Sequence, residues 1–107
     1  MENTYIVIEP EENTVELRVL QLNQEHLCNL IRCDATDAVD LPFGLIGYID
    51  GEGAWQGRQV EWELQGSPCW GTMIIAKKNE QDEEMLLSCE EEDLENIQPL
   101  IHFFEDG

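Results

Sequence analysis

The chain has 107 residues, of which 24 are acidic and only 5 basic, so its formal net charge is -19 at pH 7. This excess excludes binding to nucleic acid through phosphates and docking on an anionic membrane, because both need Lys and Arg. A hydrophobic content of 42% predicts a buried core and excludes a disordered acidic tail. At this length we expect one acidic domain over residues 1–107.

The N-terminal third predicts a hairpin followed by a helix. Residues 4–8 form an unbroken run of β-branched and aromatic side chains, which is typical of an interior strand. Residues 15–19 alternate apolar and charged side chains, so this strand should bury one face and expose the other. Asn23 is a suitable helix N-cap, and apolar residues follow at helical spacing up to Ile31. We expect this helix to lie on the sheet.

The middle of the chain predicts further strands. Residues 38–41 and 45–49 are separated by Pro42-Phe43-Gly44, whose turn chemistry favours a second hairpin. Residues 60–64 have a period of two, with Val, Trp and Leu on one face and Glu on the other. A turn is expected at residues 66–68. The apolar run that follows, residues 72–76, fits a central strand.

The C-terminal part predicts a short helix and a last strand. Ser88 and Glu91 have the spacing of a capping box, so a helix should begin there and end near Ile97, before Pro99. Residues 100–104 predict the last strand, whose exposed edge could pair two copies into a homodimer. The fold class is therefore α+β, with a mostly antiparallel sheet of about five to seven strands and one or two short helices.

A series of short motifs in a fixed order links the chain to a known family. They are Ile8-Glu9-Pro10-Glu11, residues 27–34 (LCNLIRCD), residues 37–41 (DAVDL), residues 48–53 (YIDGEG), the glycine and strand at 71–76, and the helix and strand at 88–103. The chain resembles a small uncharacterised family of unknown function that is found in phages, plasmids and other mobile elements. It departs from the family pattern at Gly51, where a longer acidic pair is usual. The resemblance implies an accessory gene of a mobile element and carries over no catalytic residue.

The sequence shows no pattern typical of an enzyme or of a metal or cofactor site. Asp50 and Glu52 could share a cation, but the EF-hand spacing is absent, so a solvated turn is the favoured interpretation. His26 and His102 have no nucleophile motif nearby, and the glycines form no phosphate-binding loop. We therefore expect a non-catalytic protein without cofactor or metal.

Cysteine usage and the ends of the chain indicate the compartment. There is no apolar run of transmembrane length, and Met1-Glu2-Asn3 lacks the features of a signal peptide, which predicts a cytoplasmic protein. No C-x-x-C pair supports a zinc site. Reduced, partly buried thiols are expected at Cys28, Cys33, Cys69 and Cys89.

The size of the net charge points to a positively charged partner. A small domain is soluble with a net charge of about 2 to 8, and more than that destabilises the folded state by self-repulsion. We therefore expect a basic or nucleic-acid-binding protein as partner, with the chain acting as a DNA-mimic-type inhibitor. The expected contact residues are Glu80, Asp82, Glu83, Glu84, Glu90, Glu91, Glu92, Asp93, Glu95, Trp55 and Trp70.

Two alternatives stay open. The chain could be a binding module for a cationic small molecule or a specific protein, with Trp55, Trp70 and neighbouring acids forming the site by cation-π contact and ion pairing. It could also be an acidic accessory protein with no charge-specific partner, whose acidity reflects a high-salt habitat.

Overall fold

The structure is a computed structural model that describes residues 3–21, 23–33, 35–51, 60–81 and 86–104. In chain order the elements are β1 (Asn3–Glu9), β2 (Thr14–Leu20), α1 (Gln24–Ile31), β3 (Thr36–Asp40), the 3-10 turn η1 (Pro42–Gly44), β4 (Leu45–Asp50), β5 (Trp62–Leu64), β6 (Ser67–Cys69), β7 (Met73–Lys78), β8 (Leu86–Leu87), α2 (Glu91–Ile97), η2 (Gln98–Leu100) and β9 (Ile101–Phe103). The predicted α+β class is confirmed. All pairings between the described strands are antiparallel.

The strands form two sheets. The larger has six strands in the order β2-β1-β7-β4-β3, with β8 paired to β7, and the smaller has the order β6-β5-β9. Both predicted hairpins, β1–β2 and β3–β4, are present. The prediction that residues 72–76 form a central strand is also confirmed, because β7 lies between β1 and β4. A separate smaller sheet was not predicted.

The central strands β1 and β7 are buried on both faces, which explains their unbroken apolar sequences. Tyr5 and Val7 of β1 point to one face, while Ile6 and Ile8 point to the other, as the period of a strand requires. All four side chains are at most 3% exposed. The sheet therefore separates two apolar cores, and each core needs its own cover.

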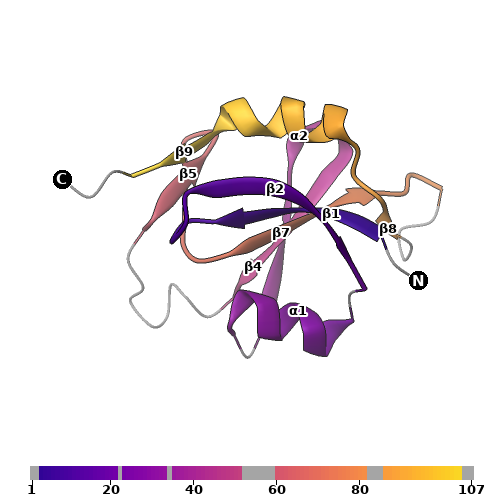
Figure 1. The fold of residues 1–107 in the computed structure, drawn as a ribbon, viewed down its shortest axis with the longest axis horizontal. Coiled ribbons are helices and arrows are strands. Elements are labelled where there is room, and N and C mark those ends of the chain that lie inside the picture. The colour runs from indigo at the N-terminus through magenta and orange to yellow at the C-terminus, as the bar shows by residue number, and fades with distance from the viewer. Residues whose placement is uncertain (1–2, 22, 34, 52–59, 82–85, 105–107) are drawn as a thin grey trace.

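Helix α1 covers the first core (Figure 1). Its predicted N-cap is confirmed, since the side chain of Asn23 accepts a hydrogen bond of 2.8 Å from the His26 backbone N–H. Leu27 and Ile31, one turn apart, are buried against Tyr5 and other residues of this face. The expected position of the helix on the sheet is thus confirmed.

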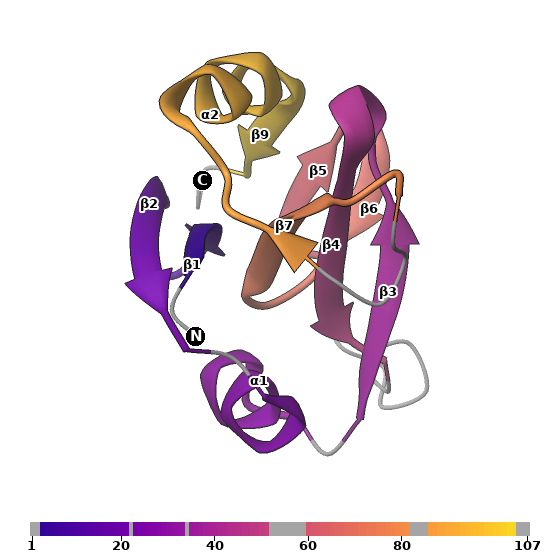
Figure 2. The ribbon, with the colours of Figure 1, turned by 90° about the vertical axis from the view of Figure 1, so that its right-hand side faces the viewer.

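Helix α2 and the smaller sheet cover the second core, on the opposite side from α1 (Figure 2). Among the described residues, Trp62 of β5 is the largest side chain without exposed surface. Its indole Nε1 donates a hydrogen bond of 3.0 Å to the backbone oxygen of Gly71, and its ring packs against Phe103 of β9. Trp62 thus packs the smaller sheet onto the second core and bonds to the segment that leads into β7.

The helix start predicted at Ser88 is wrong. The N-cap of α2 is Glu90, and the capping box is formed with Asp93, whose carboxylate accepts a hydrogen bond of 2.8 Å from the Glu90 backbone N–H. Ser88 instead joins α2 to β1, because its hydroxyl accepts a hydrogen bond of 3.0 Å from the Thr4 backbone N–H. The predicted helix end at Ile97 is confirmed.

Three details of the smaller elements differ from expectation. The turn predicted at residues 66–68 is formed by Gln65 and Gly66, whose φ angles of 51° and 81° are those of a two-residue hairpin turn. The strand predicted at residues 60–64 is shorter than expected, because β5 begins at Trp62. Val60 lies before it and is 40% exposed. Val19 is 64% exposed because it lies at the end of the edge strand β2, beyond Leu17, the last residue of that strand to pack on the second core.

The last strand, β9, covers residues 101–103 of the predicted 100–104 and pairs with β5 of the smaller sheet. Its other edge has no partner among the described strands. The homodimer stays a prediction. Of the solvated turn expected at Asp50 and Glu52, Glu52 lies outside the described residues, while Asp50 ends β4 and is 3% exposed.

Candidate functional site

The basic side chains that the structure describes are all paired with carboxylates of the same domain. The pairs are Arg18 with Glu16, Arg32 with Glu11 at 3.5 Å, Lys77 with Asp93 at 3.4 Å, and Lys78 with Asp40 at 2.6 Å. The fifth basic residue, Arg58, lies outside the described residues. Within the described part of the chain, no basic side chain is left without an acidic neighbour to bind an external anion.

The carboxylates, in contrast, are mostly exposed and in excess. The exposed acids among the described residues are Glu11, Glu12, Glu16, Glu25, Asp37, Asp40, Glu80, Glu90, Glu91, Glu92 and Glu95. Only Glu11, Glu16 and Asp40 of these are paired with a described basic side chain. The others face solvent, and they produce the negative potential of the surface.

Among the described residues, the densest group of exposed acids is on α2 and its N-cap. Glu90, Glu91, Glu92 and Glu95 are exposed, while Ile97 faces the second core. At a rise of about 1.5 Å per residue, these four carboxylates lie along roughly 8 Å of helix axis, or about one charge per 2 Å. B-form DNA has one phosphate charge per about 1.7 Å of its axis. We call these four residues the α2 acidic face.

Asp93, which the sequence placed among the contact residues, does not belong to this face. It is 6% exposed and is occupied by the capping box of α2 and by Lys77. Its carboxylate therefore stabilises the helix start and is not available to a partner. Glu80 is exposed after β7. The other predicted acids of this group, Asp82, Glu83 and Glu84, lie outside the described residues, as does Trp55.

Trp70, the other predicted aromatic anchor, is half-buried. Its indole Nε1 donates a hydrogen bond of 3.1 Å to the backbone oxygen of Asp50. The residue lines a crevice of about 180 Å³ together with apolar side chains such as Val39, Ile49 and Pro68. Trp70 is thus not part of the α2 acidic face, and the structure does not bring the predicted aromatic and acidic residues together.

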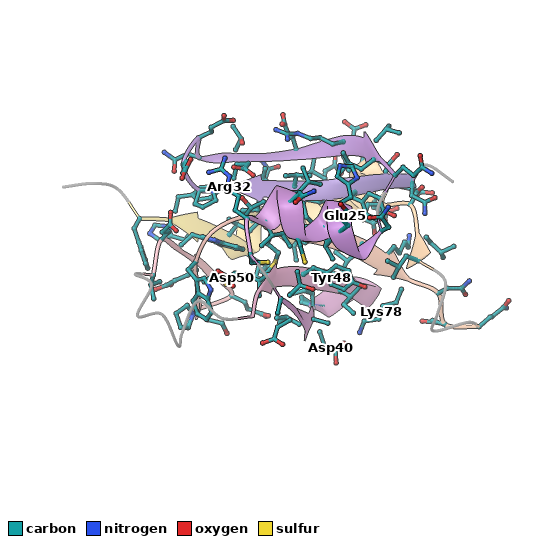
Figure 3. The ribbon with its side chains drawn as sticks, turned by 90° about the horizontal axis from the view of Figure 1, so that it is seen from below. Glu25, Arg32, Asp40, Tyr48, Asp50 and Lys78 are labelled. Carbon is teal, nitrogen blue, oxygen red and sulfur yellow. The ribbon has the colours of Figure 1, made fainter. Side chains whose placement is uncertain are left out.

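A larger cavity, of about 470 Å³, lies where β3, β4, β7 and β8 meet. Asp40 and Glu80 supply two carboxylates, Tyr48 an aromatic ring and Lys78 an ammonium group. Figure 3 shows Asp40, Tyr48 and Lys78 next to one another beside α1. Burial, and to a smaller extent Tyr5, raises the pKa of Tyr48, so its phenol stays neutral. This cavity could not be predicted from the sequence, because its residues come from four separate segments.

Residues considered for catalysis or metal binding are dispersed. Among the described residues, no three His, Cys, Asp or Glu side chains are close enough together to hold a metal ion. His26 Nδ1 lies 2.6 Å from the backbone oxygen of Gln21, and His102 is exposed on β9. Neither described helix is long and apolar enough to cross a membrane.

A scan of protein-family models and searches of curated proteins and of solved structures gave no match. The resemblance to a family from mobile elements stays a prediction. The function must then be inferred from the charges and contacts of the chain itself.

Proposed function

We propose that this chain is a non-catalytic interaction protein whose exposed carboxylates bind a basic surface of another protein. The partner class that fits best is a nucleic-acid-binding host protein, which the chain would inhibit as a DNA mimic on behalf of a mobile element. The observation that supports this most is the internal pairing of every described basic side chain, which leaves a surface of almost one sign.

The charge spacing on α2 favours a partner protein that normally binds phosphates. A site built for DNA presents Lys and Arg at the spacing of the backbone, and a group of carboxylates at similar density would satisfy the same side chains. Both kinds of anion accept hydrogen bonds from guanidinium and ammonium groups. Binding should therefore weaken steeply as salt is added.

The test is a competition for DNA. The immobilised protein would be exposed to host extract, eluted with a salt gradient, and each retained protein purified and assayed for displacement of its DNA. We expect at least one DNA-binding protein to be retained and its DNA to be displaced at low salt, with the inhibition lost at high salt. Recovery of basic proteins whose DNA binding is unaffected would contradict mimicry.

A pair of matched variants tests the role of α2. Replacing Glu91, Glu92 and Glu95 by Gln leaves the capping box intact and removes three charges from the α2 acidic face. At roughly 0.2–1 kcal/mol per surface charge pair, inhibition should weaken about 3- to 150-fold. The control variant Glu12→Gln, Glu25→Gln and Asp37→Asn removes the same charge elsewhere and should weaken inhibition less. An equal loss in both variants would mean that binding depends on net charge and not on α2.

The cavity between β3, β4, β7 and β8 favours a second candidate, a site for a small organic cation. Tyr48 could bind an ammonium group by cation-π contact, while Asp40 and Glu80 balance its charge. Lys78 already occupies Asp40, so a ligand amine would replace it.

This second candidate is tested with spermidine in a thermal-shift titration at physiological salt. A cavity site predicts a saturable rise in Tm that Tyr48→Leu reduces and Lys78→Gln increases, since the latter frees Asp40. A shift that does not saturate and is the same in both variants would indicate diffuse charge screening. Failure of both candidates would leave an acidic accessory protein with no charge-specific partner.

A further inference from the structure

The end of α1 brings two cysteines together. Arg32 ends the helix in the left-handed conformation, with φ 63° and ψ 52°. The backbone N–H groups of both Arg32 and Cys33 then donate to the backbone oxygen of Cys28, the second over 3.0 Å. This is a Schellman-type helix end, in which the residue after the left-handed turn folds back over the residue five positions before it. In this motif the side chains at these two positions are frequently in contact.

The Cys28 side chain accordingly lies close enough to the Cys33 thiol to raise its pKa. Both residues are half-buried, whereas Cys69 and Cys89 are buried in the second core. Cys33 packs at the edge of the first core, beside Leu27 and its neighbours. The two sulfur atoms are therefore held together by the backbone of the helix end and remain partly open to solvent.

The surroundings give the two thiols different roles. Burial, then the negative charge of Asp50, raises the pKa of Cys33 to about 11. The neighbouring Cys28 side chain contributes to the same rise. Cys33 therefore stays a thiol at neutral pH, and Cys28 is the sulfur positioned to react with an external disulfide.

We propose that Cys28 and Cys33 form a thiol-disulfide exchange site, at which a low-molecular-weight disulfide such as glutathione disulfide converts the pair into an intramolecular disulfide. This inference is independent of the proposed function, because it does not involve the acidic surface. Oxidation would fix the end of α1 to the segment that leads into β3.

The reaction proceeds in two balanced exchange steps. The Cys28 thiolate attacks one sulfur of glutathione disulfide, which forms a mixed disulfide on Cys28 and releases one glutathione. Cys33 then loses its proton to solvent and attacks Cys28 Sγ, which forms the Cys28–Cys33 bond and releases the second glutathione. Two protein thiols are oxidised and one glutathione disulfide is reduced. The contact between the two side chains makes the second step intramolecular and offsets the poor ionisation of Cys33.

The experiment uses the folded chain and glutathione disulfide at pH 8. We expect the intact mass to fall by about 2 Da as one disulfide forms. Trypsin cleaves after Arg32, between the two cysteines, so the oxidised protein should give peptides 19–32 and 33–58 joined by a bond that dithiothreitol breaks. The rate should rise with pH, because the thiolate is the nucleophile.

Single serine variants assign the roles. Cys33→Ser should stop at the mixed disulfide and gain about 305 Da, the mass of one bound glutathione. Cys28→Ser should react at least about tenfold more slowly. The double variant Cys69→Ser and Cys89→Ser, if folded, should react as the parent does. Failure of the folded parent to form the 28–33 link, while the same chain forms it in urea, would overturn the proposal. Equal rates for the two single variants would do the same.

Discussion

Replacing Trp62 with alanine should lower the free energy of unfolding by about 3–5 kcal/mol, the range for truncating a large aromatic side chain in a core. Trp62 has no exposed surface and lies in the second core between the smaller sheet, the larger sheet and α2. The substitution would leave a cavity and would also remove the hydrogen bond to the Gly71 oxygen. Urea unfolding followed by far-UV circular dichroism measures the loss.

Two conservative variants separate the contributions. Trp62→Phe keeps most of the apolar volume but leaves the Gly71 oxygen without its donor, so we expect a cost of roughly 1–3 kcal/mol. Trp70→Phe, at the half-buried tryptophan, should cost less than Trp62→Ala because its surroundings are partly open. A cost below about 1 kcal/mol for Trp62→Ala would mean that the smaller sheet contributes little to the fold.

The parts of the fold that were predicted correctly are those in which one local pattern decides the outcome. The unbroken apolar sequence of residues 72–76 requires burial on both faces, and β7 is the strand in the middle of the larger sheet. The cap at Asn23 and the spacing of Leu27 and Ile31 likewise determine α1 without reference to distant residues.

The start of α2 was predicted wrongly because two capping boxes overlap in the sequence. Ser88 and Glu91 have the required spacing, and so do Glu90 and Asp93. Serine is usually the better N-cap, but the Ser88 hydroxyl is occupied by the Thr4 backbone N–H, a residue 84 positions away. Lys77 of β7 also pairs with Asp93 and favours the second box. Tertiary contacts thus decide between two local signals.

The same kind of long-range contact explains why the candidate site was only partly predicted. The α2 acidic face was predicted from the run of acids at residues 90–95, with Asp93 as the exception. The burial of Asp93 depends on Lys77, and the cavity beside Tyr48 depends on four segments that meet only in the folded sheet. The separate smaller sheet has the same origin, because three strands of three residues carry no signal of which partner they choose.

Internal pairing of the few basic residues has a consequence for both stability and recognition. Arg18 and Arg32 are paired on the surface, where each ion pair contributes only about 0–1 kcal/mol, so these pairs do little to offset self-repulsion. Their clearer effect is on what a partner meets, since each described basic side chain lies beside a carboxylate and the exposed carboxylates outnumber the basic groups. A domain with so much unbalanced negative charge should also be sensitive to any further ionisation.

Strongly alkaline solution should therefore destabilise the domain through its buried thiols. Burial raises the pKa of Cys69 and of Cys89 from 9.0 to about 11, and in Cys89 the charge of Asp93 adds to the effect. Between these values the unfolded chain releases thiol protons that the folded chain retains, so unfolding is favoured as pH rises. The stabilisation by the protonated thiols is present below pH 9 and is lost progressively up to about pH 11. Each thiol should account for roughly 2–3 kcal/mol.

Urea unfolding measured at intervals from pH 8 to 11 would show this loss, and a double variant isolates its cause. Cys69→Ala and Cys89→Ala removes both buried thiols and should be less stable than the parent at pH 8, because it leaves two small cavities. Its free energy of unfolding should nevertheless fall less between pH 9 and 11, since only Cys33 remains as a thiol whose pKa is raised to about 11. The single variant Cys28→Ala, at a half-buried position, should keep the steep dependence of the parent. Parallel curves for parent and double variant would assign the alkaline loss to general charge repulsion and not to Cys69 and Cys89.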